Sequence, residues 1–269
     1  MRIEGQRVVV TGAAGGIGAA LCRAFKAAGA STVVAVDIDR AGIAAVEKEF
    51  GGVGLRCDVS VETELADLID HVESRYGPIS IFCSNAGVAA GFDLASENVA
   101  FAPNAVWERS WAINVMAHIY AARALLPRMR ERGGGYFLNT VSAAGLLSQI
   151  GGAAYATTKH AAIGFAECLA IAHRDHGIRV SVLCPQAVDT KMLHSVPKGP
   201  QWGDGLISAD AVAAMAIEGI EAERFLILPH PEVARYMQNK TNDYDRWIGG
   251  MVKLQRSFRS GSQTDGAGA

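Results

Sequence analysis

Tyr155 and Lys159 are the two residues whose types and spacing most directly suggest chemistry. They lie four positions apart in a stretch that favours a helix, and residues at i and i+4 share one helix face. A free tyrosine has a pKa of about 10, and a nearby ammonium group lowers that pKa because it favours the phenolate. The pair therefore predicts an acid and base that exchanges a proton with an alcohol. An exposed tyrosine beside a solvated lysine has the same spacing, so that alternative stays open at this point.

A glycine-rich turn provides the second chemical signal. Thr11–Gly18 follows a run of β-branched residues and opens a helical stretch. Gly12, Gly16 and Gly18 allow the backbone to turn sharply and to approach a pyrophosphate, whose charge is met by N–H groups at the helix N-terminus. The pattern predicts a dinucleotide site, and a tight strand-to-helix turn without a ligand is the alternative.

Asp37 ends the second strand-like run, about 20 residues beyond the glycines. A carboxylate at that position can accept hydrogen bonds from ribose hydroxyls, and it repels a 2′-phosphate. We therefore expect NAD rather than NADP as cofactor. Arg40 could partly offset the repulsion, and a solvated turn aspartate is the alternative for Asp37.

The glycine spacing resembles the TGxxxGxG motif of the short-chain dehydrogenase/reductase family, and four further segments agree with it in order. The resemblance extends over roughly residues 5–229. The four segments are Cys57-Asp58-Val59 after a third strand-like segment; Ser84-Asn85-Ala86-Gly87, which is similar to NNAG with Ser84 in place of the first asparagine; Tyr155–Lys159, which matches YxxxK; and Cys184–Thr190, which is similar to PGxVxT with Gln186 in place of the glycine.

The resemblance implies a catalytic set of Asn114, Ser142, Tyr155 and Lys159. Ser142, 13 residues before Tyr155, would hold the substrate oxygen by a hydrogen bond. Asn114 would hold a water that relays protons to the lysine. Asparagine is a poor helix former, so a specific role is plausible, although a helix kink or a core hydrogen bond would also explain it.

The resemblance also implies the residues that hold NAD. The adenine would lie against Asp58, and the nicotinamide carboxamide would meet Val188 and Thr190. The expected cofactor-binding residues are Gly12, Gly16, Ile17, Gly18, Asp37, Asp58, Val59, Asn85, Gly87, Tyr155, Lys159, Pro185, Val188 and Thr190. We expect no metal site, because no His, Asp or Glu group has ligand spacing.

Short β-branched runs alternate with longer helical stretches, and this alternation predicts an α/β fold with a parallel sheet covered on both faces. By resemblance it is a Rossmann-type, doubly wound sheet of about seven strands in a single domain. The expected strands are Arg7–Thr11, Thr32–Asp37, Ile79–Ser84, Tyr136–Val141, Arg179–Cys184 and Phe225–Leu228. The expected helices are Gly18–Ala28, Ala41–Phe50, Glu62–Arg75, Trp107–Arg132, Ala154–His176 and Ala209–Ala222.

Three parts of the chain are expected. Residues 1–230 form the catalytic domain, residues 231–260 a C-terminal helical extension, and the small, polar residues 261–269 a frayed tail. The extension is predicted as one amphipathic helix over Glu232–Phe258. It would pack on its own chain or on a partner, and the alternative is that it closes a neighbour's active site.

The segment Lys191–Ile207 is predicted to be a mobile substrate lid. Its apolar residues suggest a bulky hydrophobic or cyclic substrate, with ordinary loop packing as the alternative. Phe92, Leu94 and Leu146 could also face the pocket. The role of Gln186 stays open between narrowing the pocket and contacting the substrate.

Composition narrows the possible partners. The net charge is −2 and the basic residues are scattered, so we expect no nucleic-acid partner. The sequence contains no run of about 18 uncharged apolar residues, so we expect no membrane-spanning helix. Five dispersed cysteines favour reduced thiols and a cytoplasmic location. The resemblance implies a homotetramer, with helices 107–132 and 154–176 packed across a two-fold axis, and a dimer is possible.

These observations predict an oxidoreductase that transfers a hydride between NAD(H) and a secondary alcohol or ketone. Two alternatives are kept. One is an epimerase or dehydratase on the same scaffold, and the other is a regulatory protein that senses NAD without turnover.

Overall fold

The computed structural model describes the backbone of residues 1–264 and the side chains of residues 1–259. Its centre is a seven-stranded parallel sheet in the order β3-β2-β1-β4-β5-β6-β9. The chain reverses direction across the sheet between β1 and β4, where ligand crevices form in doubly wound folds. The strands are β1 Arg7–Thr11, β2 Thr32–Asp37, β3 Val53–Arg56, β4 Ile81–Ser84, β5 Gly135–Thr140, β6 Ile178–Leu183 and β9 Leu226–Ile227.

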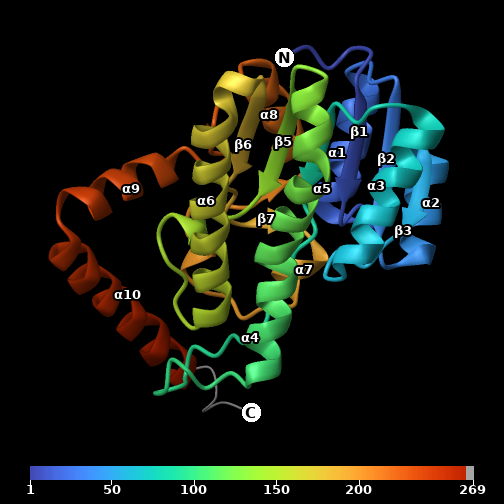
Figure 1. Ribbon diagram of the computed structural model, residues 1–269. Coiled ribbons are helices and arrows are strands. Elements are labelled where there is room, and N and C mark those ends of the chain that lie inside the picture. Colours follow the sequence, from blue (N-terminus) through green and yellow to red (C-terminus); the bar gives the residue numbers. More distant parts are fainter. Residues whose placement is uncertain (265–269) are drawn as a thin grey trace.

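Helices cover both faces of the sheet (Figure 1). The side chains of β1 show why two layers are needed, since Val9 packs into one hydrophobic cluster and Val8 and Val10 into the other. The first cluster lies against α3 Glu62–Tyr76, α5 Ala117–Glu131 and α6 Ala153–His173. The second lies against α1 Gly16–Ala27, α2 Arg40–Phe50 and α8 Ala209–Glu221. The predicted doubly wound, single-domain α/β fold is confirmed.

The predicted strands and the shorter predicted helices are found within about two residues of their expected ends. The strand-like segment before Cys57 forms β3 at the sheet edge. Short elements were not expected in the segment after β6, where β7 Val188–Asp189 pairs with β8 Ile207–Ser208 around α7 Lys191–His194. These two-residue strands have no hydrophobic period of their own, so only the pairing reveals them.

The helix predicted over Trp107–Arg132 consists of three pieces. It begins earlier, with α4 Asn104–Trp111, continues through a π-helical turn over Ala112–Met116, and ends as α5. A π turn has the same hydrophobic pattern as an α-helix over so short a span, so the sequence does not reveal it. Asn114 lies in the middle of this turn.

The C-terminal extension is two helices rather than the single predicted one. After α9 Glu232–Asn242 the backbone is extended at Asp243, and α10 Tyr244–Thr264 follows. Asp243 Oδ1 accepts a hydrogen bond from Arg246 N at 2.9 Å, which caps the second helix. Residues 261–264 of the expected frayed tail are helical, because α10 continues through Thr264, and residues 265–269 lie outside the described residues. Within the described residues, no helix has the length and apolar character to cross a membrane.

Candidate active site

A cavity of about 1300 Å³ lies at the carboxyl ends of β1, β4, β5 and β6. It runs from the glycine-rich turn to the C-terminal helices. Of the predicted cofactor residues, all except Asp58 and Val59 line it. Of the predicted catalytic residues, Ser142, Tyr155 and Lys159 line it.

The glycine-rich turn is held in place by the threonine that begins its motif, a role that the spacing of the glycines does not reveal. Thr11 Oγ1 accepts hydrogen bonds from Asn85 N at 3.0 Å and Ala86 N at 3.1 Å. In return, Asn85 Nδ2 donates to Thr11 O at 3.0 Å. A Cβ on Gly18 would lie 2.1 Å from Gly12 O, so close packing at this turn requires glycine. The side chain of Asn85 therefore joins two turns, while the same residue lines the cavity.

Asp37 and Asp58 occupy different environments. Asp37 lines the cavity, and its two carboxylate oxygens accept from Ala14 N at 3.0 Å and Asp39 N at 3.1 Å. Asp58 Oδ1 instead accepts from Ser60 N at 3.0 Å and Ser60 Oγ at 2.6 Å, in a local turn outside the cavity lining. The structure thus brings Asp37 to the cavity and leaves Asp58 and its neighbour Val59 beside it.

Asn114 lies behind the cavity and connects three segments. Its Oδ1 accepts from Val88 N at 2.9 Å, and its Nδ2 donates to Val88 O at 3.0 Å and to Thr158 Oγ1 at 3.1 Å. A Cβ on Gly87 would lie 3.3 Å from Asn114 Oδ1 and 3.4 Å from Lys159 Nζ. The absence of that Cβ therefore leaves a small polar space between the amide and the ammonium.

Lys159 is buried on α6, and its Nζ donates to Thr140 O at 3.3 Å. Burial lowers the pKa of this amine to about 8. The Nζ atom lies 5.7 Å from the centroid of the Tyr155 ring. The i and i+4 positions thus place the two side chains together, as predicted.

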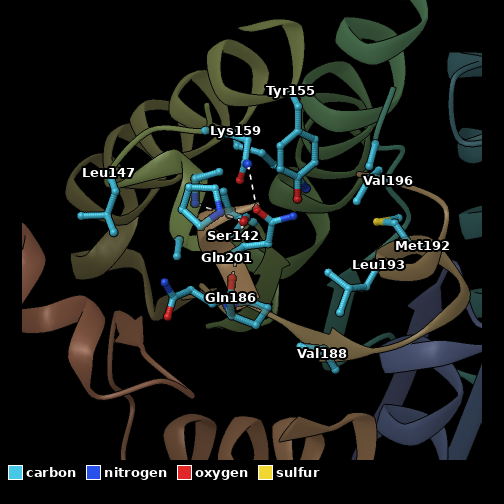
Figure 2. A pocket seen from close by; sticks show the side chains of 18 of the residues that line it. Ser142, Leu147, Tyr155, Lys159, Gln186, Val188, Met192, Leu193, Val196 and Gln201 are labelled. Carbon is cyan, nitrogen blue, oxygen red and sulfur yellow. Dashed lines mark hydrogen bonds between the residues drawn. The ribbon is translucent and has the colours of Figure 1, made fainter. Parts of the chain in front are cut away.

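The Tyr155 phenol points into the cavity, with Lys159 and Ser142 beside it (Figure 2). Burial raises its pKa above the usual value, and the hydrogen bond with Ser142 opposes that rise. The spacing of Tyr155 and Lys159 predicts a lowered pKa for the phenol, whereas its pKa in the chain without cofactor is raised. The reason is that burial removes water from the phenol, while the same burial disfavours the charge on Lys159 itself.

Ser142 begins the segment that leaves β5. Its Oγ accepts from Ala144 N at 3.1 Å and donates to Pro185 O at 3.4 Å. Pro185 comes from the carboxyl end of β6, so the serine joins the ends of two neighbouring strands.

Gln186 lines the cavity beside Val188 and Thr190. Its backbone N donates to His230 Nδ1 at 3.1 Å, and its buried Oε1 has no hydrogen-bond partner among the described residues. His230 is a residue that sequence reasoning missed. It lies between Pro229 and Pro231, and nothing in that pattern indicates a contact with Gln186.

The far part of the cavity is mostly apolar. Leu147 lies on one side in Figure 2, with Met192, Leu193 and Val196 of the predicted lid on the other. Phe92 lines the cavity as predicted, and its ring packs on Tyr155 with centroids 5.6 Å apart. The expectation that Leu94 and Leu146 face the pocket is wrong, because neither lines the cavity.

The C-terminal helices complete the cavity of their own chain. The sequence alone does not reveal this contribution, because it depends on the direction in which α9 leaves the sheet. The residues of α9, α10 and the turn between them that line the cavity are Tyr236, Asn239, Asn242, Asp243, Arg246, Trp247, Gly250, Met251, Leu254 and Phe258.

Comparison with known proteins agrees with this geometry. The family profile described as short chain dehydrogenase matches residues 6–201. The chain belongs to the short-chain dehydrogenase family. It is 33% identical over 257 residues to 1-deoxy-11-beta-hydroxypentalenate dehydrogenase of Streptomyces exfoliatus. The match covers 92% of this chain and 91% of that protein.

Two further relatives are similar to this short-chain dehydrogenase. It is 32% identical over 196 residues to 3beta-hydroxysteroid dehydrogenase 2 of Eggerthella lenta, over 71% of this chain and 74% of that one. Its fold matches the crystal structure of a short-chain dehydrogenase/reductase from Burkholderia phymatum in complex with NAD, with a TM-score of 0.78 and 26% identity. That match covers 91% of this chain and 96% of that one.

Proposed function

We propose that this protein is an NAD-dependent oxidoreductase that transfers a hydride between NAD(H) and a secondary alcohol or ketone. The observation that carries the proposal is the position of Tyr155, whose phenol points into the cavity between Ser142 and the apolar walls. The relatives named as dehydrogenases support it.

The near part of the cavity fits NAD. Glycine backbone at Gly12, Gly16 and Gly18 leaves room for a pyrophosphate, and the first turn of α1 offers N–H groups to it. Asp37 provides acceptors for the ribose hydroxyls, and the related structure in complex with NAD supports the assignment. Thr190 and Val188 would hold the carboxamide end. When bound, NAD⁺ supplies a hydride acceptor and a positive charge that favours the Tyr155 phenolate.

The chain's own residues handle the proton and the substrate oxygen. Ser142 donates a hydrogen bond to that oxygen and orients it toward Tyr155. In oxidation, the Tyr155 phenolate accepts the hydroxyl proton as the C–H bond breaks and the C=O bond forms; in reduction, the phenol returns that proton. Lys159 stabilises the phenolate, and Asn114 holds a water next to the lysine ammonium.

The substrate class follows from the apolar part of the cavity. Its walls include Leu147, Met192, Val196 and Trp247, which suit a bulky hydrophobic or cyclic alcohol. The names of the relatives, a hydroxypentalenate dehydrogenase and a hydroxysteroid dehydrogenase, support the same class.

The proposal is tested by absorbance at about 340 nm with NAD⁺ and a panel of bulky secondary alcohols, for the wild type and Tyr155→Phe. We expect NADH formation by the wild type and a loss of at least about 100-fold in kcat/KM for the variant. Equal activity of both proteins would overturn the mechanism. Tight NAD binding without turnover of any alcohol would point to the regulatory alternative.

We also infer a homotetramer in the cytoplasm. Helices α4 and α6 expose large apolar side chains, since Trp111 is 44% and Ile171 82% exposed in the single chain. Such exposure on the helix pair predicted to cross a two-fold axis supports association. The five free cysteines support a reducing compartment. Analytical ultracentrifugation checks the assembly, and a monomer at micromolar concentration would contradict it.

A further inference from the structure

The C-terminal arm, residues 232–259, leaves the end of the sheet as α9 and turns back as α10 (Figure 1). Its first helix packs on the segment that follows Ser142, where Ala143, Leu147 and Val233 form a small hydrophobic cluster. Around that cluster lie Tyr236 and Trp247 of the arm. The arm is therefore in contact with the same segment that forms one wall of the cavity.

Lys240 lies at this contact and is buried, with no carboxylate partner among the described residues. Its Nζ donates to Leu146 O at 2.8 Å and to Leu147 O at 2.7 Å, and it lies 3.4 Å from His160 Nε2. His160 Nδ1 lies 2.9 Å from Ala156 O, which can only accept, so Nδ1 carries the ring proton and Nε2 accepts from Lys240. All three donors of the ammonium are thus used on neutral acceptors.

Two other contacts attach the arm to the rim of the cavity. Tyr236 donates its hydroxyl to Asp204 Oδ1 at 2.8 Å, which connects α9 to the lid segment. Arg259, near the far end of α10, donates to Leu94 O at 3.1 Å and Ser96 O at 2.5 Å. The arm thus spans the cavity between three separate segments, and the residues between these attachments line the cavity.

We propose that Lys240 is a positioning residue that holds the C-terminal arm over the substrate cavity and fixes the Leu146–Leu147 turn. The turn matters because Leu147 forms part of the apolar wall, and the short helix Ala143–Gly145 connects it directly to Ser142. The arm then determines how large an alcohol is held against Tyr155. This inference rests on the proposed function, since it concerns the substrate of the same site.

The physical reason for assigning this role to Lys240 is the cost of burying an ammonium group. A buried charge needs good hydrogen-bond geometry to offset its lost hydration, and three acceptors provide that geometry only in the docked arrangement. An apolar replacement removes the donors and leaves two carbonyl oxygens of the turn without partners. The turn then gains other accessible positions, although the hydrophobic cluster remains.

The test compares Lys240→Met with Lys253→Met, which removes an exposed lysine of α10. Steady-state kinetics are measured with the largest and the smallest secondary alcohols that the wild type oxidises, and NADH affinity by fluorescence titration. For Lys240→Met we expect KM for the largest alcohol to rise about tenfold, with a much smaller change for the smallest alcohol and unchanged NADH affinity. Lys253→Met should behave as the wild type.

Two further measurements separate positioning from a general loss of stability. Lys240→Arg keeps donors for both carbonyls and should recover most of the preference for the large alcohol. The emission of Trp247, obtained by difference from Trp247→Phe in each background, should shift to longer wavelength in Lys240→Met as the arm opens. An unchanged size preference together with unchanged emission would overturn the proposal. A wild type that oxidises no alcohol, together with an emission shift in Lys240→Met, would instead count against the proposed function alone.

Discussion

Two buried lysines of this protein differ in how fully their ammonium groups are hydrogen-bonded. Lys240 has three acceptors, whereas Lys159 has only Thr140 O among the described residues. An ammonium with unused donors beside a small polar space can bind a water molecule. Lys159 is therefore suited to exchange protons, and Lys240 is suited to hold two segments together.

A pH profile tests the coupling of Lys159 to Tyr155. Alcohol oxidation needs the phenolate, and burial raises the pKa of Tyr155, so kcat/KM should rise with pH toward the alkaline side. Lys159→Met removes the charge that favours the phenolate, so the rise should move to higher pH and the rate near pH 7 should fall. Lys48→Met, on the exposed side of α2, is the control. A profile that does not move would show that the lysine has no influence on the phenol.

Asp37 gives a prediction about cofactor choice. Asp37→Asn keeps an oxygen acceptor for a backbone N–H but removes the negative charge that repels a 2′-phosphate. The ratio of kcat/KM with NAD to that with NADP should fall by about tenfold or more. Steady-state kinetics with both cofactors at saturating alcohol measure it. If the wild type prefers NADP, Arg40 or the backbone dominates and the assignment of Asp37 is wrong.

At the scale of elements, the π-helical turn positions Asn114. The side-chain amide of Asn114 is hydrogen-bonded to the backbone N–H and C=O of Val88 and to the hydroxyl of Thr158 on α6. It therefore connects the loop after β4 to the helix that carries Tyr155. The extra residue in the turn directs the asparagine inward. The sequence shows an asparagine in a helix, but the partners lie 26 and 44 residues away, so local pattern cannot reveal the turn.

Asn114→Ala tests this connection through stability. The variant leaves the Val88 N–H and C=O without their partners, which should lower the free energy of unfolding by about 2–4 kcal/mol. Urea unfolding followed by circular dichroism measures the change. Asn104→Ala, at the exposed start of α4, should change stability by less than about 0.5 kcal/mol. Similar stability of the two variants would show that the amide has no structural role.

At the scale of the whole molecule, His118 makes the stability depend on pH. It lies on α5, only 2% exposed, and burial together with the nearby Lys159 lowers its pKa to about 3. The unfolded chain binds a proton near pH 6.5 and the folded chain does not. The neutral imidazole therefore contributes stability above that pH, and the contribution is lost as pH falls from about 6.5 toward 3.

The expected loss from His118 at pH 5 is about 2 kcal/mol, relative to pH 7. Urea unfolding between about pH 4 and pH 7 measures the slope for the wild type and for His118→Gln, whose side chain does not titrate. The variant should show a smaller slope over this range. Equal slopes would mean that folding does not lower the pKa of His118.

The sequence by itself determined the α/β fold, the glycine-rich turn, and the pairing of Tyr155 with Lys159. These depend on hydrophobic period, on glycine conformations and on helical spacing, which are local properties of the chain. Family motifs added Ser142 and Asn114, and the structure brings both to the same site.

Only the tertiary structure decided the surroundings of that site. Burial set the direction of the Tyr155 pKa, since desolvation depends on all the segments packed around the phenol. The tertiary structure also placed the C-terminal arm over the cavity, because the direction of α9 depends on the contacts of Lys240 with Leu146 and Leu147, more than 90 residues away. Tyr155 and Lys159 are fixed by four residues of helix, whereas the walls that select their substrate are assembled from distant segments.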